Sequence, residues 1–296
     1  MIQSLRVTNY RCLRDVTLSL GAFTVVVGPN ASGKTALADA LVVDGFDSGD
    51  HWRGKKDPPS WSLRQDGGQA QTFRNPKLIP VRRAKYVLQP RTLRSGVQAN
   101  EVYHLAPDGQ NIANLFDTLT REQQEAFVAD FVKLVPVYAD IKARALRGEK
   151  RLQFEDLWER GLWYEPHQVS DGTLLAAAFV ALVYQRDTPD LIVIEDPDHG
   201  LHPYLLQQVV ELLRAVSAGA IGPRPVQVVC TTHSKALLDY LEPNEARFIS
   251  RDRETGETKM RRAPTDNPKW REVYSRFGES LGDLWMTGSL GGVPGK

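Results

Sequence analysis

Eight consecutive residues of this chain fit the pattern G-x-x-x-x-G-K-[ST] at every required position. They are Gly28, Pro29, Asn30, Ala31, Ser32, Gly33, Lys34 and Thr35. The glycines let such a loop wrap so that backbone N–H groups converge on phosphate oxygens, and the following helix directs its positive end at the same anion. Lys34 is then expected to reach the β- and γ-phosphates, and Thr35 to give Mg²⁺ a hydroxyl ligand. The loop therefore predicts a site for a nucleoside triphosphate with magnesium.

Two adjacent acids, Glu195 and Asp196, directly follow the apolar segment Leu191–Ile194. Carboxylates at the end of a buried strand are costly to desolvate without a cation, and beside a phosphate loop that cation is magnesium. Glu195 is expected to hold Mg²⁺ through water. Asp196 is expected to be the general base that orients the attacking water.

Two further segments could contact the terminal phosphate. His233 ends the apolar segment that starts at Val226, where an imidazole can hydrogen-bond the γ-phosphate and the attacking water. Ser170 and Gly172 form a Ser-x-Gly turn at the start of a predicted helix. Ser170 can simply cap that helix, or the turn can bind the γ-phosphate of ATP held by a partner subunit.

Alternating strands and helices are needed to position these residues. Apolar, β-branched runs predict strands within residues 1–27 and over 191–194, 226–231 and 247–250. Helical periodicity predicts helices over 34–43, 174–185 and 204–216, and Thr255-Gly256 predicts a hairpin turn. This alternation is typical of an α/β fold.

The middle of the chain differs in pattern. Residues 45–80 read as irregular with at most one hairpin, and 86–88 as a strand followed by Gln89. From about 110 to 161 the spacing predicts helices, with Thr120 and Gln123 as a capping box, and no heptads that would indicate a coiled coil. We therefore predict one composite domain, with an ATPase core at 1–105 and 162–296 and a helical insertion at 106–161.

Bulk properties restrict the class of protein. The 296 residues are 42% hydrophobic and carry a net charge of +1, which gives no overall signal for nucleic acid. No apolar run approaches the ~20 residues of a membrane span and no signal peptide is visible, so a cytoplasmic protein with no membrane partner is expected. Cys12 and Cys230 are expected to be buried, reduced thiols.

Taken in order, the motifs resemble those of ABC-type ATPases, within the SMC/RecF/OLD-like branch. Asn9-Tyr10-Arg11 resembles the opening N-F-R motif, and Ser170-Asp171-Gly172-Thr173 the S-D-G-T form of the signature. Glu195-Asp196-Pro197 with Gly200-Leu201-His202-Pro203 resembles the E-E-P-E-x-G-L-H-P stretch, and Thr231-Thr232-His233-Ser234 the T-T-H-S switch. The likeness covers most of the chain and is weakest at 45–105.

This resemblance implies a P-loop ATPase head that forms a homodimer with two ATP molecules between its subunits. The loop of one subunit and Ser170–Thr173 of the other would complete each site, and Gln89 would contact Mg²⁺ and water. Asn9 and Arg11 would either lie near the nucleotide or be plain residues of the N-terminal strand. Two departures stand out. Asp196 replaces a glutamate, which predicts slow hydrolysis because its arm is shorter by one methylene, and Leu175 replaces an arginine that relatives often carry.

The output of ATP hydrolysis is harder to infer. OLD-like proteins commonly carry a Toprim nuclease domain, and the 63 residues after His233 leave too little room for one. We expect a switch subunit for a separately encoded effector, a nuclease or toxin, in genome defence or DNA repair. A transporter-type ATP-binding subunit and a non-hydrolysing scaffold are the alternatives, and the assembly could extend beyond a dimer.

Basic residues raise the question of a DNA contact. They are Arg82, Arg83, Lys85, Arg91, Arg94 and a cluster at 142–151. A solvated helix face is the favoured interpretation of such residues.

Overall fold

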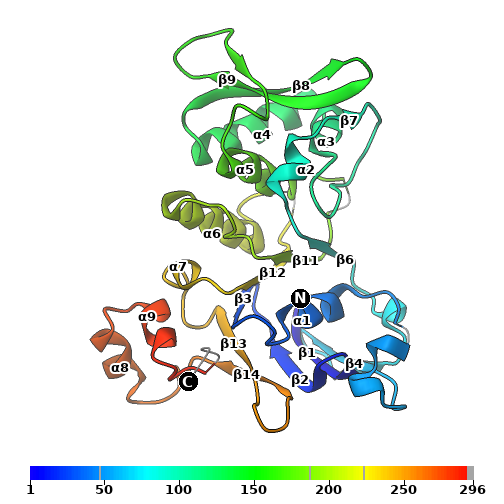
Figure 1. Cartoon of the computed structure of the whole chain (residues 1–296), viewed down its shortest axis with the longest axis vertical. Helices are drawn as coiled ribbons and strands as arrows, with labels where there is room; N and C mark the ends of the chain where they lie inside the picture. Colours follow the sequence, from blue (N-terminus) through cyan, green and yellow to red (C-terminus); the bar gives the residue numbers. More distant parts are fainter. Residues whose placement is uncertain (47, 187, 223, 292–296) are drawn as a thin grey trace. The chain divides into compact units, whose positions relative to one another are not determined.

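The structure, a computed structural model, describes residues 1–46, 48–186, 188–222 and 224–291. The chain folds into two compact units, each assembled from segments that are far apart in sequence (Figure 1). Unit 1 consists of Met1–Lys85, Asp190–Asp198 and Val226–Lys296, and unit 2 of Tyr86–Pro189 and His199–Pro225. These boundaries differ from the division at 105/106 and 161/162 predicted from sequence.

A sheet with a parallel centre organises unit 1, with its strands in the order β14-β13-β3-β12-β11-β6. The strands are β3 Phe23–Val27, β6 Arg83–Tyr86, β11 Leu191–Glu195, β12 Gln227–Thr232, β13 Ala246–Arg251 and β14 Thr258–Arg262. Parallel pairing joins β11 to β12, β12 to β3 and β3 to β13, while β14 returns antiparallel. Because parallel strands end at one edge, the segments that follow β3, β11 and β12 meet there.

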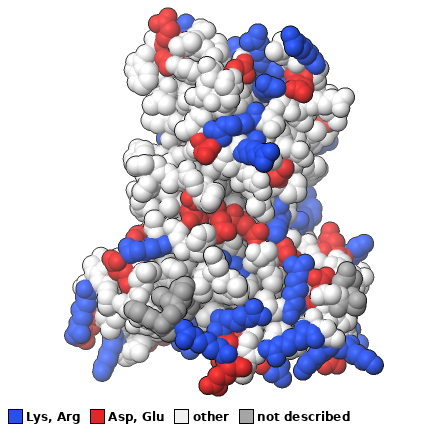
Figure 2. Space-filling model, in the orientation of Figure 1, with Lys and Arg blue, Asp and Glu red and all other residues white. Residues whose placement is uncertain are grey.

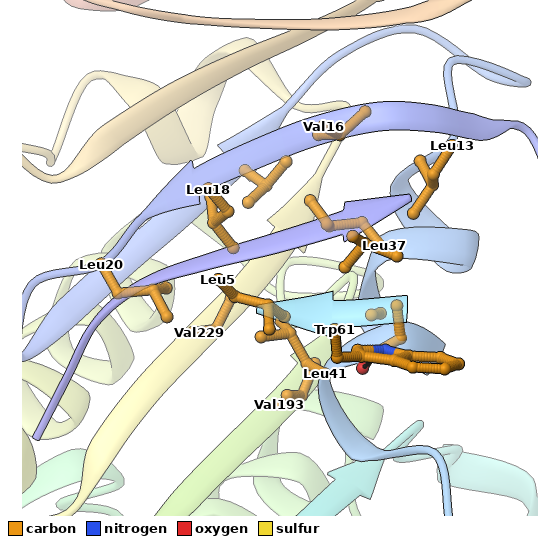
Figure 3. Packing of buried hydrophobic residues seen from close by; sticks show 14 of the residues in the cluster. Leu5, Leu13, Val16, Leu18, Leu20, Leu37, Leu41, Trp61, Val193 and Val229 are labelled. Atoms are coloured by element: carbon orange, nitrogen blue, oxygen red, sulfur yellow. Dashed lines mark hydrogen bonds between the residues drawn. The ribbon is translucent and has the colours of Figure 1, made fainter. Parts of the chain in front are cut away.

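An antiparallel sheet packs over helix α1 (Lys34–Val42) in the same unit. Its strands are, in spatial order, β2 Leu13–Ser19, β1 Ile2–Tyr10, β4 Ser60–Gln65 and β5 Gln71–Phe73. Figure 3 shows Leu5 and Leu18 of this sheet in one buried cluster with Leu37 and Leu41 of α1 and with Trp61. The Trp61 indole is fully buried and donates a 3.0 Å hydrogen bond to the Ala40 carbonyl. This core fixes the helix that begins at the phosphate loop.

Shorter elements complete unit 1. They are the 3₁₀ turns η1 Ser48–Asp50, η2 Trp52–Gly54 and η3 Pro76–Leu78, and the helices α7 Lys235–Leu238, α8 Trp270–Arg276 and α9 Leu281–Met286. The predicted Thr255-Gly256 hairpin is confirmed between β13 and β14, where Gly256 has φ 66°. Residues 45–80 contain the β4–β5 hairpin allowed for by the sequence. The strand expected at 86–88 lies earlier, as β6.

Unit 2 consists of helices and a small antiparallel sheet. Its helices are α2 Pro90–Arg94, α3 Ile112–Thr118, α4 Arg121–Leu134, α5 Asp171–Ala181 and α6 Pro203–Ala218. Its strands are β7 Val97–Gln98, β8 Tyr138–Leu146, β9 Glu149–Asp156 and β10 Trp163–Tyr164. The predicted capping box is confirmed, because Thr120 and Gln123 exchange hydrogen bonds at the start of α4. Ser170 caps α5 as expected.

The helical prediction for 110–161 is wrong over its second half. Residues 138–156 form the β8–β9 hairpin, whose turn places Arg147 at φ 52° and Gly148 at φ 83°. Positive φ at both central residues is the geometry of a type I′ turn, which matches the twist of paired strands. The basic residues Lys142 and Arg144 are two positions apart, which is the side-chain period of a strand. The sequence prediction treated them only as part of a basic cluster.

No helix in the described part of the chain is both long and apolar enough to span a membrane. Cys230 is buried as predicted, and Cys12 is only partly covered. Both thiols are free.

Candidate nucleotide site

The phosphate loop spans the end of β3 and the start of α1 in unit 1. Gly28 N–H donates to the Thr232 carbonyl of β12 at 3.2 Å, and Thr258 Oγ1 of β14 donates to the Ser32 carbonyl at 3.2 Å. Gly33 has φ 108°, a conformation that L side chains rarely adopt. A Cβ on Gly28 would lie 2.3 Å from the Ile249 carbonyl oxygen. The backbone conformation at Gly33 and the nearby backbone oxygen at Gly28 therefore require glycine at both positions.

Lys34 points back over this loop. Its Nζ donates to the carbonyl oxygens of Gly28 and Pro29 at 2.7 and 2.8 Å. Burial lowers the pKa of Lys34 below its ordinary value, although the carboxylates of Asp196, Glu195 and Asp198 oppose the shift. An ammonium group satisfied by two loop carbonyls can exchange them for phosphate oxygens. Thr35, the next residue, is exposed.

The acids at the end of β11, where Glu195 is the last strand residue and Asp196 follows it, lie in contrasting environments. The Glu195 side chain is only 11% exposed, whereas that of Asp196 is 41% exposed. Asp196 also has φ 44°, and its N–H donates to the Thr231 carbonyl at 3.0 Å. Left-handed backbone at a residue other than glycine is strained, and such strain gathers at functional sites.

Asp196 and His233 are in contact across the ends of β11 and β12. His233 Nδ1 lies 3.2 Å from Asp196 Oδ1, and both side chains are about half exposed. Thr232 Oγ1 donates to Asp198 at 2.8 Å and accepts the Ser234 N–H at 3.0 Å, which fixes the turn that carries the histidine. The sequence-predicted acid and histidine are therefore neighbours at the edge of the sheet.

An ion-pair network connects the N-terminal motif with the first of the two acids. Arg11 binds Asp39 of α1 and, at 2.7 Å, Asp50. Asp39 also accepts from Lys85 of β6, and Lys85 Nζ lies 3.2 Å from Glu195 Oε2. Arg11 itself is engaged by carboxylates, with φ 48° and its guanidinium over the Tyr10 ring.

Two orphaned atoms test whether this site fits a nucleotide with a metal ion. Ser32 Oγ and Glu195 Oε1 are both buried, and neither has a hydrogen-bond partner in the described chain. Such atoms are rare in folded proteins and indicate a missing partner. A loop hydroxyl beside phosphate and a carboxylate beside hydrated Mg²⁺ would satisfy both. The residues present therefore fit ATP and Mg²⁺.

The remaining predicted residues belong to unit 2. Ser170 Oγ accepts the Thr173 N–H at 3.1 Å, and a Cβ on Gly172 would lie 2.9 Å from Leu205. Gln89 is exposed and precedes α2, where its side chain makes no capping hydrogen bond.

Arg94 anchors the start of α5. It binds Asp171 and donates to the Val169 carbonyl at 3.0 Å. Leu175, at the position where relatives often carry arginine, is buried. An arginine from α2 thus holds the start of this helix.

Several of the basic residues considered for a DNA contact have partners within the chain. Arg82 pairs with Asp190, Lys85 with two carboxylates, and Arg94 with Asp171. The Arg83 side chain is only 5% exposed. These residues make internal contacts, and a contact of theirs with DNA stays a prediction. The cluster at 142–151 lies on the β8–β9 hairpin.

Sequence reasoning missed the roles of Asp39 and Lys85. Asp39 lies in the helix after the phosphate loop but is not part of any recognised motif. Lys85 was counted with the nearby arginines because it is basic. The available sequence signal was that Asp39 follows Lys34 by five residues, on the helix that starts at the loop.

Two family models match this chain, one over residues 71–239 and one over residues 1–44. Residues 71–239, more than half of the chain, match the family described as "AAA domain, putative AbiEii toxin, Type IV TA system". Residues 1–44 match the family "AAA ATPase domain". A 41-residue segment is 49% identical to the OLD nuclease of Thermus scotoductus, and this alignment spans 14% of the chain and 8% of that nuclease.

Solved structures of SMC heads share the fold. The SMC head domain from Thermotoga maritima matches with a TM-score of 0.56 at 14% identity, covering 88% of this chain and 98% of that one. An SmcHead bound to the C-winged helix domain of ScpA gives 0.58 at 15%, covering 88% and 96%. A Pyrococcus furiosus Smc head bound to the C-terminal domain of ScpA gives 0.58 at 12%, covering 94% and 99%. At these identities the likeness establishes the fold, and it confirms the predicted α/β P-loop class.

Proposed function

Because the chain belongs to the family described as "AAA domain, putative AbiEii toxin, Type IV TA system" and has the fold of SMC-type ATPase heads, we propose that it is an ATP-driven switch subunit. It binds ATP with Mg²⁺, closes as a homodimer around the nucleotide, and hydrolyses ATP slowly. The observation that carries this proposal is the convergence of Lys34, Glu195, Asp196 and His233 at one edge of the unit 1 sheet.

Each residue has a role that follows from its place. Lys34 exchanges its two loop carbonyls for the β- and γ-phosphates, and the N–H groups of Gly28–Thr35 surround the phosphate chain. Thr35 and Glu195 hold Mg²⁺, Glu195 through water, and Gln89 remains a further candidate ligand by resemblance alone. Bound Mg²⁺ neutralises charge that develops on the transferred phosphoryl group.

Asp196 takes the proton of the attacking water, and its half-exposed position leaves room for that water. His233, 3.2 Å from Asp196 Oδ1, orients the base and donates toward the γ-phosphate. The short aspartate arm sets the base back, so turnover is slow.

A second subunit would complete the site. Ser170 and Gly172 at the start of α5 offer a hydroxyl and helix N–H groups to the γ-phosphate bound by a partner copy. The names of similar proteins support an effector as the output. The matched family description refers to a toxin, the similar segment comes from a nuclease, and two of the similar SMC heads are bound to a domain of ScpA. We therefore place a separately encoded nuclease or toxin, acting in genome defence or DNA repair, downstream of the switch.

Mass in solution tests the switch. Light scattering with and without ATP·Mg²⁺ is expected to move the wild type from monomer toward dimer and to trap Asp196→Asn as dimer. A mass that ignores nucleotide in both proteins contradicts ATP-gated dimerisation. Dimers that release no phosphate would favour the non-hydrolysing scaffold.

The β8–β9 hairpin favours nucleic acid as a second ligand. Arg144 stands directly opposite Arg151, a like-charge pair that destabilises a free hairpin. With Arg147 at the turn, these side chains line a 380 Å³ pocket that also includes Glu149 and Glu165. Figure 2 shows Lys and Arg side chains gathered in the region where Figure 1 places β8 and β9. Facing arginines are suited to bind a phosphate of the nucleic acid backbone.

Fluorescence anisotropy with a labelled DNA duplex at two salt concentrations tests this interaction. Arg144→Thr is expected to weaken binding, to reduce the salt slope by about 1 for each phosphate that is no longer neutralised, and to raise Tm because the repulsion disappears. Arg74→Thr is the matched control, because it removes the same charge from an exposed site in unit 1. Equal binding by both variants excludes the hairpin as the DNA-binding surface.

A further inference from the structure

We propose that Lys85 is a tethered cation that neutralises Glu195 while the site holds no nucleotide and releases it to Mg²⁺ when ATP·Mg²⁺ binds. Lys85 is then a positioning residue for the metal-holding acid. This inference rests on the proposed function and adds to it an exchange of one cation for another.

The Glu195 carboxylate needs a cation close by. Its side chain is 11% exposed, and a buried, ionised carboxylate is costly unless it is paired. Lys34, the nearby loop lysine, is occupied by the carbonyls of Gly28 and Pro29. Within the described residues, the cation that contacts Glu195 is Lys85, with Nζ 3.2 Å from Oε2.

The two oxygens of this carboxylate are not equivalent. Oε2 accepts from Lys85, whereas Oε1 is buried without a partner among the described residues. Lys85 thus orients the group and satisfies one oxygen only. The other oxygen remains available for a ligand of the nucleotide-bound state, such as a water of hydrated Mg²⁺.

Lys85 also contacts a second carboxylate, with which it can remain paired. Its Nζ also donates to Asp39, which belongs to α1 and is held from the other side by Arg11. The ammonium group therefore stays paired with Asp39 after it releases Glu195. A lysine on a flexible stem suits this exchange, since its charge is compact and its donors rotate.

Thermal unfolding of Lys85→Met tests the exchange. Without nucleotide and with a chelator present, the variant is expected to unfold several degrees below the wild type, because Glu195 has no cation beside it. With saturating Mg²⁺ and a non-hydrolysable ATP analogue the deficit shrinks, since the metal now supplies the charge. The magnesium concentration that gives half-maximal nucleotide binding is expected to fall several-fold, because the competing ammonium is gone.

Two further variants serve as controls. Lys85→Arg keeps the charge and is expected to recover most of the Tm deficit of Lys85→Met without nucleotide. Arg82 lies just before β6 and pairs with Asp190 instead of Glu195. The Tm deficit of Arg82→Met is therefore expected to be equal with and without nucleotide.

A double variant keeps the test decisive if Lys85→Met folds poorly. Glu195→Gln removes the charge that Lys85 compensates, so the double variant is expected to be more stable than Lys85→Met alone. If it is not, the Lys85–Glu195 ion pair does not carry the effect and the proposal is overturned. A deficit in Lys85→Met that is unchanged by nucleotide, with unchanged magnesium dependence, also overturns it.

The wild type separates this inference from the proposed function. If the wild type shows no nucleotide-dependent rise in Tm, the ATP site itself is wrong and the exchange falls with it. If the wild type responds normally and Lys85→Met responds identically, the exchange alone is wrong.

Discussion

The acid proposed as general base sits on unusual backbone. Asp196 has φ 44°, a region where aspartate and asparagine are several-fold enriched over other residues with a side chain. A short carboxylate is therefore the better fit to this turn, even though a longer one would reach further toward the water. Local conformation offers a physical reason for aspartate where the resemblance led us to expect glutamate.

Asp196→Asn removes the negative charge of the side chain and keeps its size and shape. The amide keeps the size and tolerates the same φ, so Tm is expected to stay within a degree or two of the wild type. Loss of a general base is expected to slow phosphate release by about 10²- to 10⁴-fold. Phosphate release and thermal unfolding measured on the same preparation check both expectations. Unchanged hydrolysis would assign the base to another residue.

At Gly28, the close approach of the neighbouring strand β13 leaves no room for a side chain. Gly28→Ala puts a Cβ 2.3 Å from the Ile249 carbonyl oxygen, so the loop or β13 has to shift. We expect at least about tenfold weaker nucleotide binding, which corresponds to about 1.4 kcal/mol. Titration with a fluorescent ATP analogue measures it. Gly45→Ala is the control, because its Cβ would meet nothing within 4 Å; equal loss in both variants would point to a general effect on folding.

At the scale of elements, the start of α5 combines a structural and a functional role. Ser170 caps the helix through the Thr173 N–H, and Arg94 holds the preceding turn through Asp171 and the Val169 carbonyl. A cap contributes about 0.5–2 kcal/mol, so simple deletion confuses folding with phosphate binding.

Two substitutions of Ser170 separate these roles. Ser170→Ala loses the cap and is expected to lower Tm. Ser170→Asp keeps a capping oxygen and stability, but its charge repels a γ-phosphate, so ATP-dependent dimerisation is expected to disappear. Light scattering and thermal unfolding of both variants distinguish the outcomes. A Ser170→Asp protein that still dimerises with ATP would leave this residue with the capping role alone.

At the scale of the whole molecule, the proposal divides one active site between two copies of the chain. The phosphate loop and the acids belong to unit 1, whereas Ser170 and Gly172, which would reach the site of a partner copy, belong to unit 2. Activity is then a property of the pair and depends on protein concentration.

Mixing two inactive variants tests this division. Lys34→Ala lacks phosphate binding but keeps its signature turn, and Ser170→Asp has the opposite defect. Each alone is expected to be inactive, and an equimolar mixture is expected to regain up to about a quarter of wild-type activity, because half of the dimers are mixed and each has one intact site of two. Phosphate release from the mixture measures it. A mixture as inactive as its components contradicts sites shared between subunits.

The amino-acid sequence by itself determined the motifs that have local causes. The phosphate loop, the apolar strand before Glu195 and the caps at Thr120 and Ser170 depend on neighbours within a few residues, so spacing and residue type suffice to predict them. The α/β class followed from the same local periodicities.

Only the tertiary structure decided which distant charges meet. Lys85 is 110 residues from Glu195 and 46 from Asp39, and nothing local indicates that a β6 lysine pairs with both. The β8–β9 hairpin was missed for a related reason, since its alternating basic residues read as a charged helical surface until cross-strand pairing set their partners. Contacts between side chains far apart in sequence follow from strand order and register, which local patterns do not encode.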